Sequence, residues 1–208
     1  MAAVAELGSL DLHMSRDNIA DELDAVIRNR RKYAAFFDWP DKAVKECDVV
    51  CELLSSMHAR GDYRYTNKVE PVDDDWPDCV IRDSGGVQVG VEVTEFVDQK
   101  AVEMCERGKN VYREWSDQAV CEKIAQILKR KDEKAHHGAL YGKLILVIHN
   151  DEVDLPSSRL FHILDASPFP RTRNIDEAYL ICSYEPKLGN APNPYPYIRL
   201  NLDGPTTD

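Results

Sequence analysis

The sequence predicts an α/β fold with a three-layer α/β/α arrangement around a mixed central sheet. Three features of the sequence support this prediction. A glycine-punctuated pair of strands occupies residues 79–97, a nearly continuous apolar run follows at 143–150, and helical periodicity lies between them. A strand, a helix and then a strand apolar on both faces indicate a crossover within one sheet. Alternation of the two element types favours layered packing.

The length of 208 residues suits one domain with a sizeable core. We expect a loosely ordered N-terminus over residues 1–14, a single domain over 15–202 and a tail over 203–208. Within that domain, residues 15–60 should be helical, 61–150 should contain the central strands, and 151–202 should add C-terminal strands.

Two helices should precede the strands. Apolar side chains recur at helical spacing over residues 16–38, and Trp39-Pro40 ends that pattern. A second helix should begin after Asp41, a suitable N-cap, and end before Gly61. Glu46 falls at the edge of its apolar side.

The central strands are expected as a hairpin. Residues 79–83 contain β-branched Val80 and Ile81, which favour a strand. Glycines in the following Ser84-Gly85-Gly86 segment allow a tight turn. Residues 87–97 then alternate with period two, so that valines occupy one face while Glu92 and Thr94 occupy the other.

Further elements follow from the same patterns. We expect a short strand over 62–66 and a loop over 70–75. Helices are expected over 100–115, over 117–134 after a Ser116 cap, and over 156–164. Strands are expected over 143–150, 178–184 and 195–202. His149 lies at the carboxyl end of its strand, which is a common site position in α/β sheets. A hydrogen-bonded structural histidine is the other interpretation.

Two acids stand out in the hairpin. Asp78 begins the first strand and Glu92 lies in the middle of the second. Adjacent strands lie about 4.7–4.9 Å apart, so the hairpin can bring these carboxylates together. Carboxylate oxygens suit a hard divalent cation such as Mg²⁺. The alternative is that both are ordinary acids on a solvated hairpin face.

The segment Pro77-Asp78, thirteen residues and then Glu92-Val93-Thr94 resembles the motif of the PD-(D/E)XK nuclease superfamily. The resemblance covers residues 41–150 and extends more loosely to 202. It implies the restriction-endonuclease-like core, αβββαβ, with an added N-terminal helix and C-terminal strands. It also implies that Asp78 and Glu92 bind Mg²⁺ or Mn²⁺, and that the backbone carbonyl of Val93 is a further ligand.

The resembled family has a lysine where this chain has Thr94. That lysine positions or activates the attacking water, and a threonine hydroxyl can only supply a hydrogen bond. If the lysine has moved to the helix over 117–134, Lys123 is the expected position, with Lys100 as an alternative. A glutamate from the helix before the sheet often joins the metal site in this family. Glu46 is the better candidate for that role, and Glu22 of the first helix is the reserve.

The resemblance implies a hydrolase: a metal-dependent phosphodiesterase, or nuclease, acting on DNA. One alternative is a catalytically inactive member of the same fold that acts as a binding or regulatory protein. Another is a small-molecule or protein-binding domain in which Asp78 and Glu92 are incidental. A loss of metal binding on removing either carboxylate would separate the first from the last.

Charge and cysteine content bear on partners and location. The net charge of −11 disfavours tight, independent binding to a DNA duplex. A protein partner that supplies basic surface is therefore one expectation, and a homodimer is compatible with the sequence. The six cysteines lack metal-site spacing. No apolar run approaches the ~20 residues of a membrane helix and no secretory signal is present, so we expect a cytoplasmic protein without membrane contacts.

Overall fold

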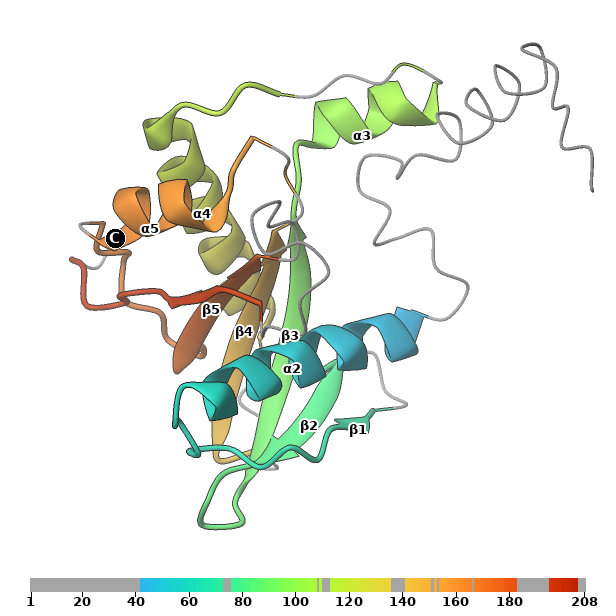
Figure 1. Ribbon diagram of the computed structural model, residues 1–208, viewed down its shortest axis with the longest axis vertical. Coiled ribbons are helices and arrows are strands. Elements are labelled where there is room, and N and C mark those ends of the chain that lie inside the picture. The colour runs from blue at the N-terminus through green and yellow to red at the C-terminus, as the bar shows by residue number, and fades with distance from the viewer. Residues whose placement is uncertain are drawn as a thin grey trace, which may run out of the picture. The chain divides into compact units, whose positions relative to one another are not determined.

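The computed structural model describes residues 42–72, 76–107, 109, 113–135, 141–150, 152, 154–165, 167–182 and 195–205. All of them belong to the compact unit Tyr33–Asp208. The helix predicted over 16–38, the N-terminus over 1–14 and the Asp41 cap lie outside the described residues. Within the described part, the protein is an α/β fold built on a mixed sheet (Figure 1).

The described helices are α2 (Lys42–Ala59), α3 (Gln99–Glu106), α4 (Asp117–Lys134) and α5 (Ser157–Asp165). The Ser116 cap of α4 is confirmed, because its hydroxyl oxygen accepts a hydrogen bond from the Ala119 amide at 3.2 Å. Helix α3 is shorter than the predicted helix over 100–115. Residues 113–116 are not helical, and Trp115 packs against Phe96 with ring centroids 4.7 Å apart.

Six strands form one sheet in the order of the chain. They are β1 (Glu70–Pro71), β2 (Cys79–Arg82), β3 (Gln88–Phe96), β4 (Lys143–Asn150), β5 (Glu177–Cys182) and β6 (Tyr197–Arg199). Strands β3, β4 and β5 run parallel to one another, whereas β1–β2, β2–β3 and β5–β6 are antiparallel. The predicted hairpin and the predicted parallel crossover to β4 are both confirmed.

Two expectations near the start of the sheet were wrong. Residues 70 and 71 were predicted as loop but form β1, where Pro71 is tolerated because the strand lies at the sheet edge. Residues 62–66 were predicted as a strand but make only one bridge, between Tyr65 and Asp83. The Tyr65 side chain turns inward instead and donates a hydrogen bond to Glu177 at 2.8 Å.

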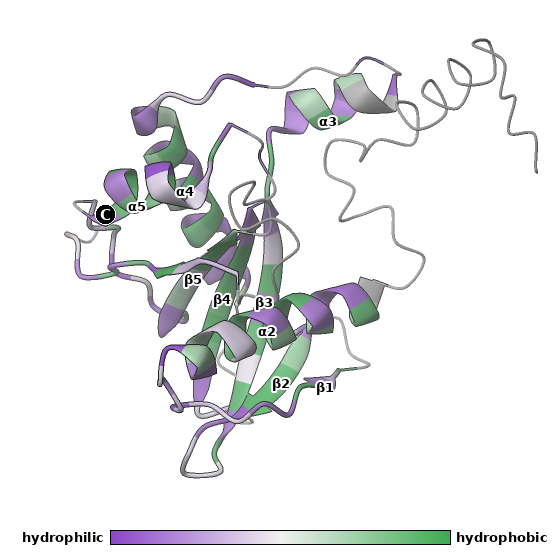
Figure 2. Cartoon of the chain, viewed as in Figure 1, coloured by the Kyte–Doolittle hydropathy of each residue, from purple (hydrophilic) through white to green (hydrophobic). Residues whose placement is uncertain are grey.

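Separate apolar clusters cover the two faces of the sheet. On one face, Val91 and Val147 pack with α2 residues such as Leu54. On the other face, alternate strand residues such as Leu146 pack with α4 and α5 residues such as Ile124. Figure 2 shows hydrophobic residues concentrated on β3, β4 and β5. This period-two division decides which helix each polar side chain of β3 meets. No described helix is both long and apolar enough to cross a bilayer.

Candidate active site

Asp78 lies where β2 begins, beside the middle of β3. The first residue of β2, Cys79, pairs with Val91 of β3. One residue earlier, the Asp78 side chain takes the place of a backbone acceptor, because its Oδ2 accepts a hydrogen bond from the Val93 amide at 2.7 Å. The Asp78 carboxylate is therefore fixed next to the peptide group that joins Glu92 to Val93.

Pro77 holds this segment close to β3. A Cβ atom on Gly90 would lie 3.2 Å from Pro77 Cγ and 3.4 Å from Leu144 Cδ1. The absence of a side chain at Gly90 thus lets the Pro77 ring lie directly on the strand. Because Leu144 belongs to the cluster beneath α4, Pro77 covers β3 on the α4 face. This packing sets the position from which Asp78 reaches Val93.

Glu92 faces α4 and forms an ion pair with Lys131, whose Nζ contacts Glu92 Oε1. Both side chains are largely buried, with 13% of Glu92 and 19% of Lys131 exposed. Thr94 lies two residues further along β3 and is also buried. The cation beside Glu92 therefore comes from a helix, while the strand position two residues after Glu92 carries a neutral hydroxyl.

Lys131 was not named from the sequence as a site residue, although its spacing carried a signal. The buried stripe of α4 runs through Val120, Ile124 and Ile127, and position 131 continues it by one turn. A lysine on a core stripe indicates a buried anionic partner. The sequence alone does not say which turn of α4 lies beside which residue of β3. That alignment is what places Lys131, and not another lysine of α4, next to Glu92.

Lys123 lies two turns earlier on α4, in different surroundings. Burial lowers the pKa of its ammonium group, and the positive charge of Arg130 lowers it further. The carboxylates of Asp98 and Glu152 act in the opposite direction. Asp98 follows the carboxyl end of β3, beyond Thr94. Lys123 thus lies near the carboxyl end of β3, whereas Lys131 is the α4 lysine that contacts Glu92. The alternative, Lys100, is exposed on α3.

Glu46 is buried on α2 and therefore on the sheet face opposite Glu92. Its neighbourhood contains two thiols, because Cys47 Sγ lies 3.1 Å from Cys79 Sγ. Burial raises the pKa of the Cys47 thiol, and the negative charges of Glu46 and Asp78 add to that increase. Asp78, at the start of β2, thus lies near the Cys47 thiol as well as the Val93 amide. Glu46 approaches it from the α2 side and does not share a face with Glu92.

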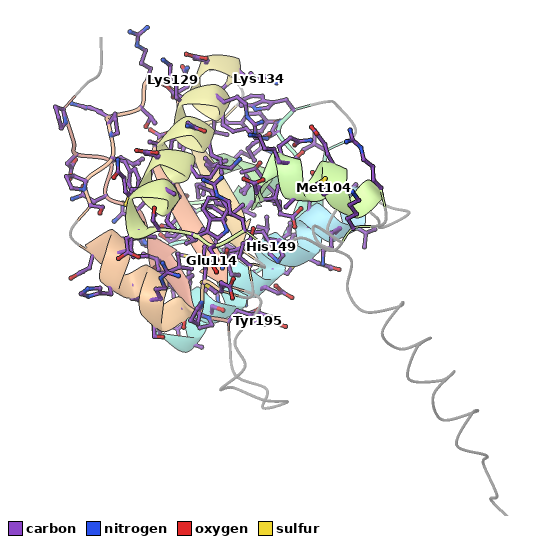
Figure 3. All side chains as sticks on the ribbon, turned by 90° about the horizontal axis from the view of Figure 1, so that it is seen from above. Met104, Glu114, Lys129, Lys134, His149 and Tyr195 are labelled. Carbon is purple, nitrogen blue, oxygen red and sulfur yellow. The ribbon has the colours of Figure 1, made fainter. Side chains whose placement is uncertain are left out.

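His149 lies in the interior of the protein beside Glu95. The two residues are in register across β3 and β4, and both are almost fully buried. They follow the alternation of Val93 and Val147, which pack beneath α2. Figure 3 labels His149 in a view from above the strand ends. His149 therefore lies on the face opposite Lys131, away from the Glu92 ion pair.

Asp78 and Glu92 supply carboxylate oxygens, the ligand type that a magnesium ion prefers. Mg²⁺ is commonly held by one or two carboxylates and completes its shell with water and phosphate oxygens. Asp78 bonds to the amide directly after Glu92, so the two acids are neighbours on the β2–β3 hairpin. Among the described residues, no group of three acidic, histidine or cysteine side chains is arranged to hold a metal. Glu46 lies on the other face of the sheet and does not form such a group with Asp78 and Glu92.

Comparison with known proteins adds no relative. No model of a protein family, no curated protein and no solved structure matches the chain. The resemblance to PD-(D/E)XK nucleases therefore rests on the sequence motif around Asp78 and Glu92.

Proposed function

We propose that this protein is a metal-dependent phosphodiesterase of the PD-(D/E)XK type that acts on DNA. The observation that carries the proposal is the ion pair between Lys131 and Glu92, one residue from the amide that binds Asp78. Two acids and a lysine are the groups that the family motif requires. Here the lysine reaches the site from α4 rather than from β3.

The order of elements supports a three-layer, restriction-endonuclease-like arrangement. Helix α2, strands β1, β2 and β3, helix α4 and strand β4 follow one another as αβββαβ, with α3 inserted before α4. The unexpected strand β1 supplies the first of the three consecutive strands. Apolar clusters under α2 and under α4 with α5 cover the two faces of the sheet.

Each side chain has a defined part in the proposed reaction. Asp78 and Glu92 would hold the cation, and the Val93 carbonyl is a further candidate ligand. A bound Mg²⁺ supplies Lewis acidity at the scissile phosphate and lowers the pKa of a coordinated water. Lys131 carries its charge on a flexible stem, so its ammonium group can leave Glu92 and donate a hydrogen bond to a phosphate oxygen. The Thr94 hydroxyl can orient a water molecule.

A cleavage assay on fluorescent DNA, with Mg²⁺, with Mn²⁺ and with a chelator, tests the proposal. Asp78→Asn and Glu92→Gln should each reduce metal-dependent cleavage by at least about 10²-fold, because each removes a charged ligand. Glu122→Gln is a matched control, since Glu122 is exposed on α4 and bonds to Gln118. Equal cleavage by Glu92→Gln and the wild type would contradict the proposal.

A non-catalytic binding or regulatory protein of the same fold is the second candidate. Thr94 at the lysine position and the net charge of −11 favour it. Metal binding separates the two candidates from an unrelated binding domain. Mg²⁺ should raise the melting temperature of the wild type but not of Asp78→Asn or Glu92→Gln. A metal-induced rise in melting temperature without any cleavage would favour the non-catalytic protein. If Mg²⁺ does not change the melting temperature, the unrelated binding domain is favoured over both candidates.

A further inference from the structure

The outer side of α4 and the loop 170–174 enclose a hollow of about 620 Å³. Lys129, Asp132 and Glu133 line it from the helix, while Arg171 and Arg173 line it from the loop. The hollow lies behind the site lysine, because Lys131 points inward from the same turns of α4 to Glu92. One stretch of helix thus contributes to both the candidate active site and the hollow.

Asp132 holds the loop in place. Its carboxylate accepts hydrogen bonds from three consecutive backbone amides, those of Arg173, Asn174 and Ile175, at 2.7–3.1 Å. The Asn174 side chain also donates to the Asp132 carbonyl at 2.8 Å. Three amides on one carboxylate fix the loop backbone relative to α4. Arg171 and Arg173 are therefore held on the side of the hollow opposite Lys129.

The cations of the hollow are available to a ligand. Lys129, Arg171 and Arg173 are exposed, and none of them forms an ion pair with a described residue. Figure 3 shows Lys129 directed away from the sheet. Asp132 is engaged by backbone amides, so Glu133 is the remaining acid of the lining. The lining thus carries three cations and two carboxylates, a local excess of positive charge in a chain whose net charge is −11.

We propose that this hollow binds backbone phosphates of a nucleic-acid strand. The proposal rests on the function proposed above, because a phosphodiesterase with an acidic surface needs a local source of phosphate contacts. Guanidinium groups match phosphate oxygens in a bidentate geometry. Two arginines on a loop whose backbone is fixed to α4 present such donors opposite a lysine. The hollow supplies from within this chain part of the basic surface that a partner was expected to bring.

Fluorescence anisotropy of a short labelled DNA, in buffer without divalent metal, tests the proposal. The variant Arg171→Ala/Arg173→Ala should bind about ten-fold more weakly than the wild type at low salt, and its slope of log affinity against log salt should fall by about 2. The control is Lys68→Ala/Arg82→Ala, which removes the same charge from exposed residues beside β1 and β2. The control should bind within about two-fold of the wild type.

Asp132→Asn separates a shaped site from general attraction. The substitution removes one negative charge and so raises the net charge by one unit. Electrostatic attraction alone therefore predicts tighter binding of DNA. Loosening of the loop predicts weaker binding, which is the result we expect. Binding equal to or tighter than that of the wild type would overturn the proposal. A change in the chemical shifts of the protein on adding inorganic phosphate, without any such change on adding DNA, would also overturn the proposal.

These measurements distinguish failure of the hollow from failure of the nuclease. Unchanged DNA binding by Arg171→Ala/Arg173→Ala, together with loss of metal-dependent cleavage in Glu92→Gln, would contradict the phosphate site and support the nuclease. Weakened DNA binding by the double arginine variant, with no cleavage by the wild type, would support the phosphate site and contradict the nuclease. If both double variants lose binding equally, the effect is one of total charge and the hollow is not the site.

Discussion

Glu92 and Glu177 are two largely buried glutamates on the same sheet, and their surroundings differ. Glu92 lies in the middle of β3 beside Asp78 and pairs with Lys131 from a helix. Glu177 begins β5, and several groups surround its carboxylate: Tyr65 at 2.8 Å, Arg64 at 3.1 Å, Arg199 at 3.6 Å, Lys143 at 3.7 Å and the Tyr179 hydroxyl. One acid shares its neighbourhood with a second acid, while the other is enclosed by donors.

The donors around Glu177 hold it as an anion. Burial alone would raise the pKa of this carboxyl group, but hydrogen bonds from Tyr179 and Tyr65 and the charges of Arg199 and Arg64 reverse the effect, so that its pKa is lowered. Burial and the bond to Glu177 together raise the pKa of the Tyr65 hydroxyl. Such an arrangement stabilises a fold. Glu92 is instead held by one lysine beside another acid, and the proposed function requires it to exchange that lysine for a metal ion.

The largest expected effect is on stability, and it separates the two glutamates. Glu177→Gln should lower the free energy of unfolding by about 3–5 kcal/mol, because a neutral amide replaces the charged acceptor of two buried hydroxyl groups, those of Tyr65 and Tyr179. Glu92→Gln should cost about 1 kcal/mol, since the glutamine oxygen can still accept a hydrogen bond from Lys131 and only the charge is lost. Urea denaturation followed by circular dichroism measures both. Equal losses would mean that Glu92 is as structural as Glu177.

The next effect is on activity and tests the partner of Glu92. Lys131→Met should reduce metal-dependent DNA cleavage by about 10²-fold, within the range lost with a group that orients or activates the reacting water. Lys123→Met is the matched control on the same helix and should leave cleavage within a few fold of the wild type. The opposite ranking would restore Lys123 as the site lysine and leave Lys131 as a structural partner of Glu92.

Most of the fold followed from local patterns. Helix α4 with its Ser116 cap, the hairpin of β2 and β3, and the apolar strand β4 all carry strong periodicity over enough residues to be recognised. Strand β1 could not be predicted, because its two residues pair only with the edge of β2 and carry no pattern of their own. Local periodicity identifies elements that bury a whole face. It says little about elements made by pairing alone.

The candidate site divides in the same way. Asp78 and Glu92 share a hairpin, so their proximity follows from local register, and the Asp78 bond to Val93 agrees with it. Lys131 depends on how far the chain between β3 and α4 displaces the helix along the strand, which no local pattern encodes. Glu46 was assigned from the helical wheel, which places it on the buried side of α2 but does not say which face of the sheet α2 covers.

A smaller effect on stability tests one donor of the Glu177 cluster. Tyr65→Phe removes the hydroxyl that bonds to Glu177 at 2.8 Å and keeps the buried ring. The free energy of unfolding should fall by about 1.5–3 kcal/mol, as expected for a hydrogen bond to a charged group. Tyr63→Phe is the control, because Tyr63 is exposed, and it should leave stability unchanged. A loss confined to Tyr65→Phe assigns the effect to the Glu177 contact.

The smallest expected effect is the pH dependence of what Glu177 contributes. Its pKa in the folded protein lies below the usual value of 4.5, so the unfolded chain binds more protons between those two pKa values. The contribution is therefore fully present above about pH 5 and is lost as pH falls through 4.5 toward the folded pKa. Asp62, whose pKa is also lowered, chiefly by its bond to Arg64, shares Arg64 with Glu177, so the comparison is made with Asp62→Asn in both proteins. The stability difference between wild type and Glu177→Gln should thus shrink between pH 6 and pH 3 in denaturation experiments. A difference that stayed constant over that range would show that the carboxylate contributes through packing and not through its charge.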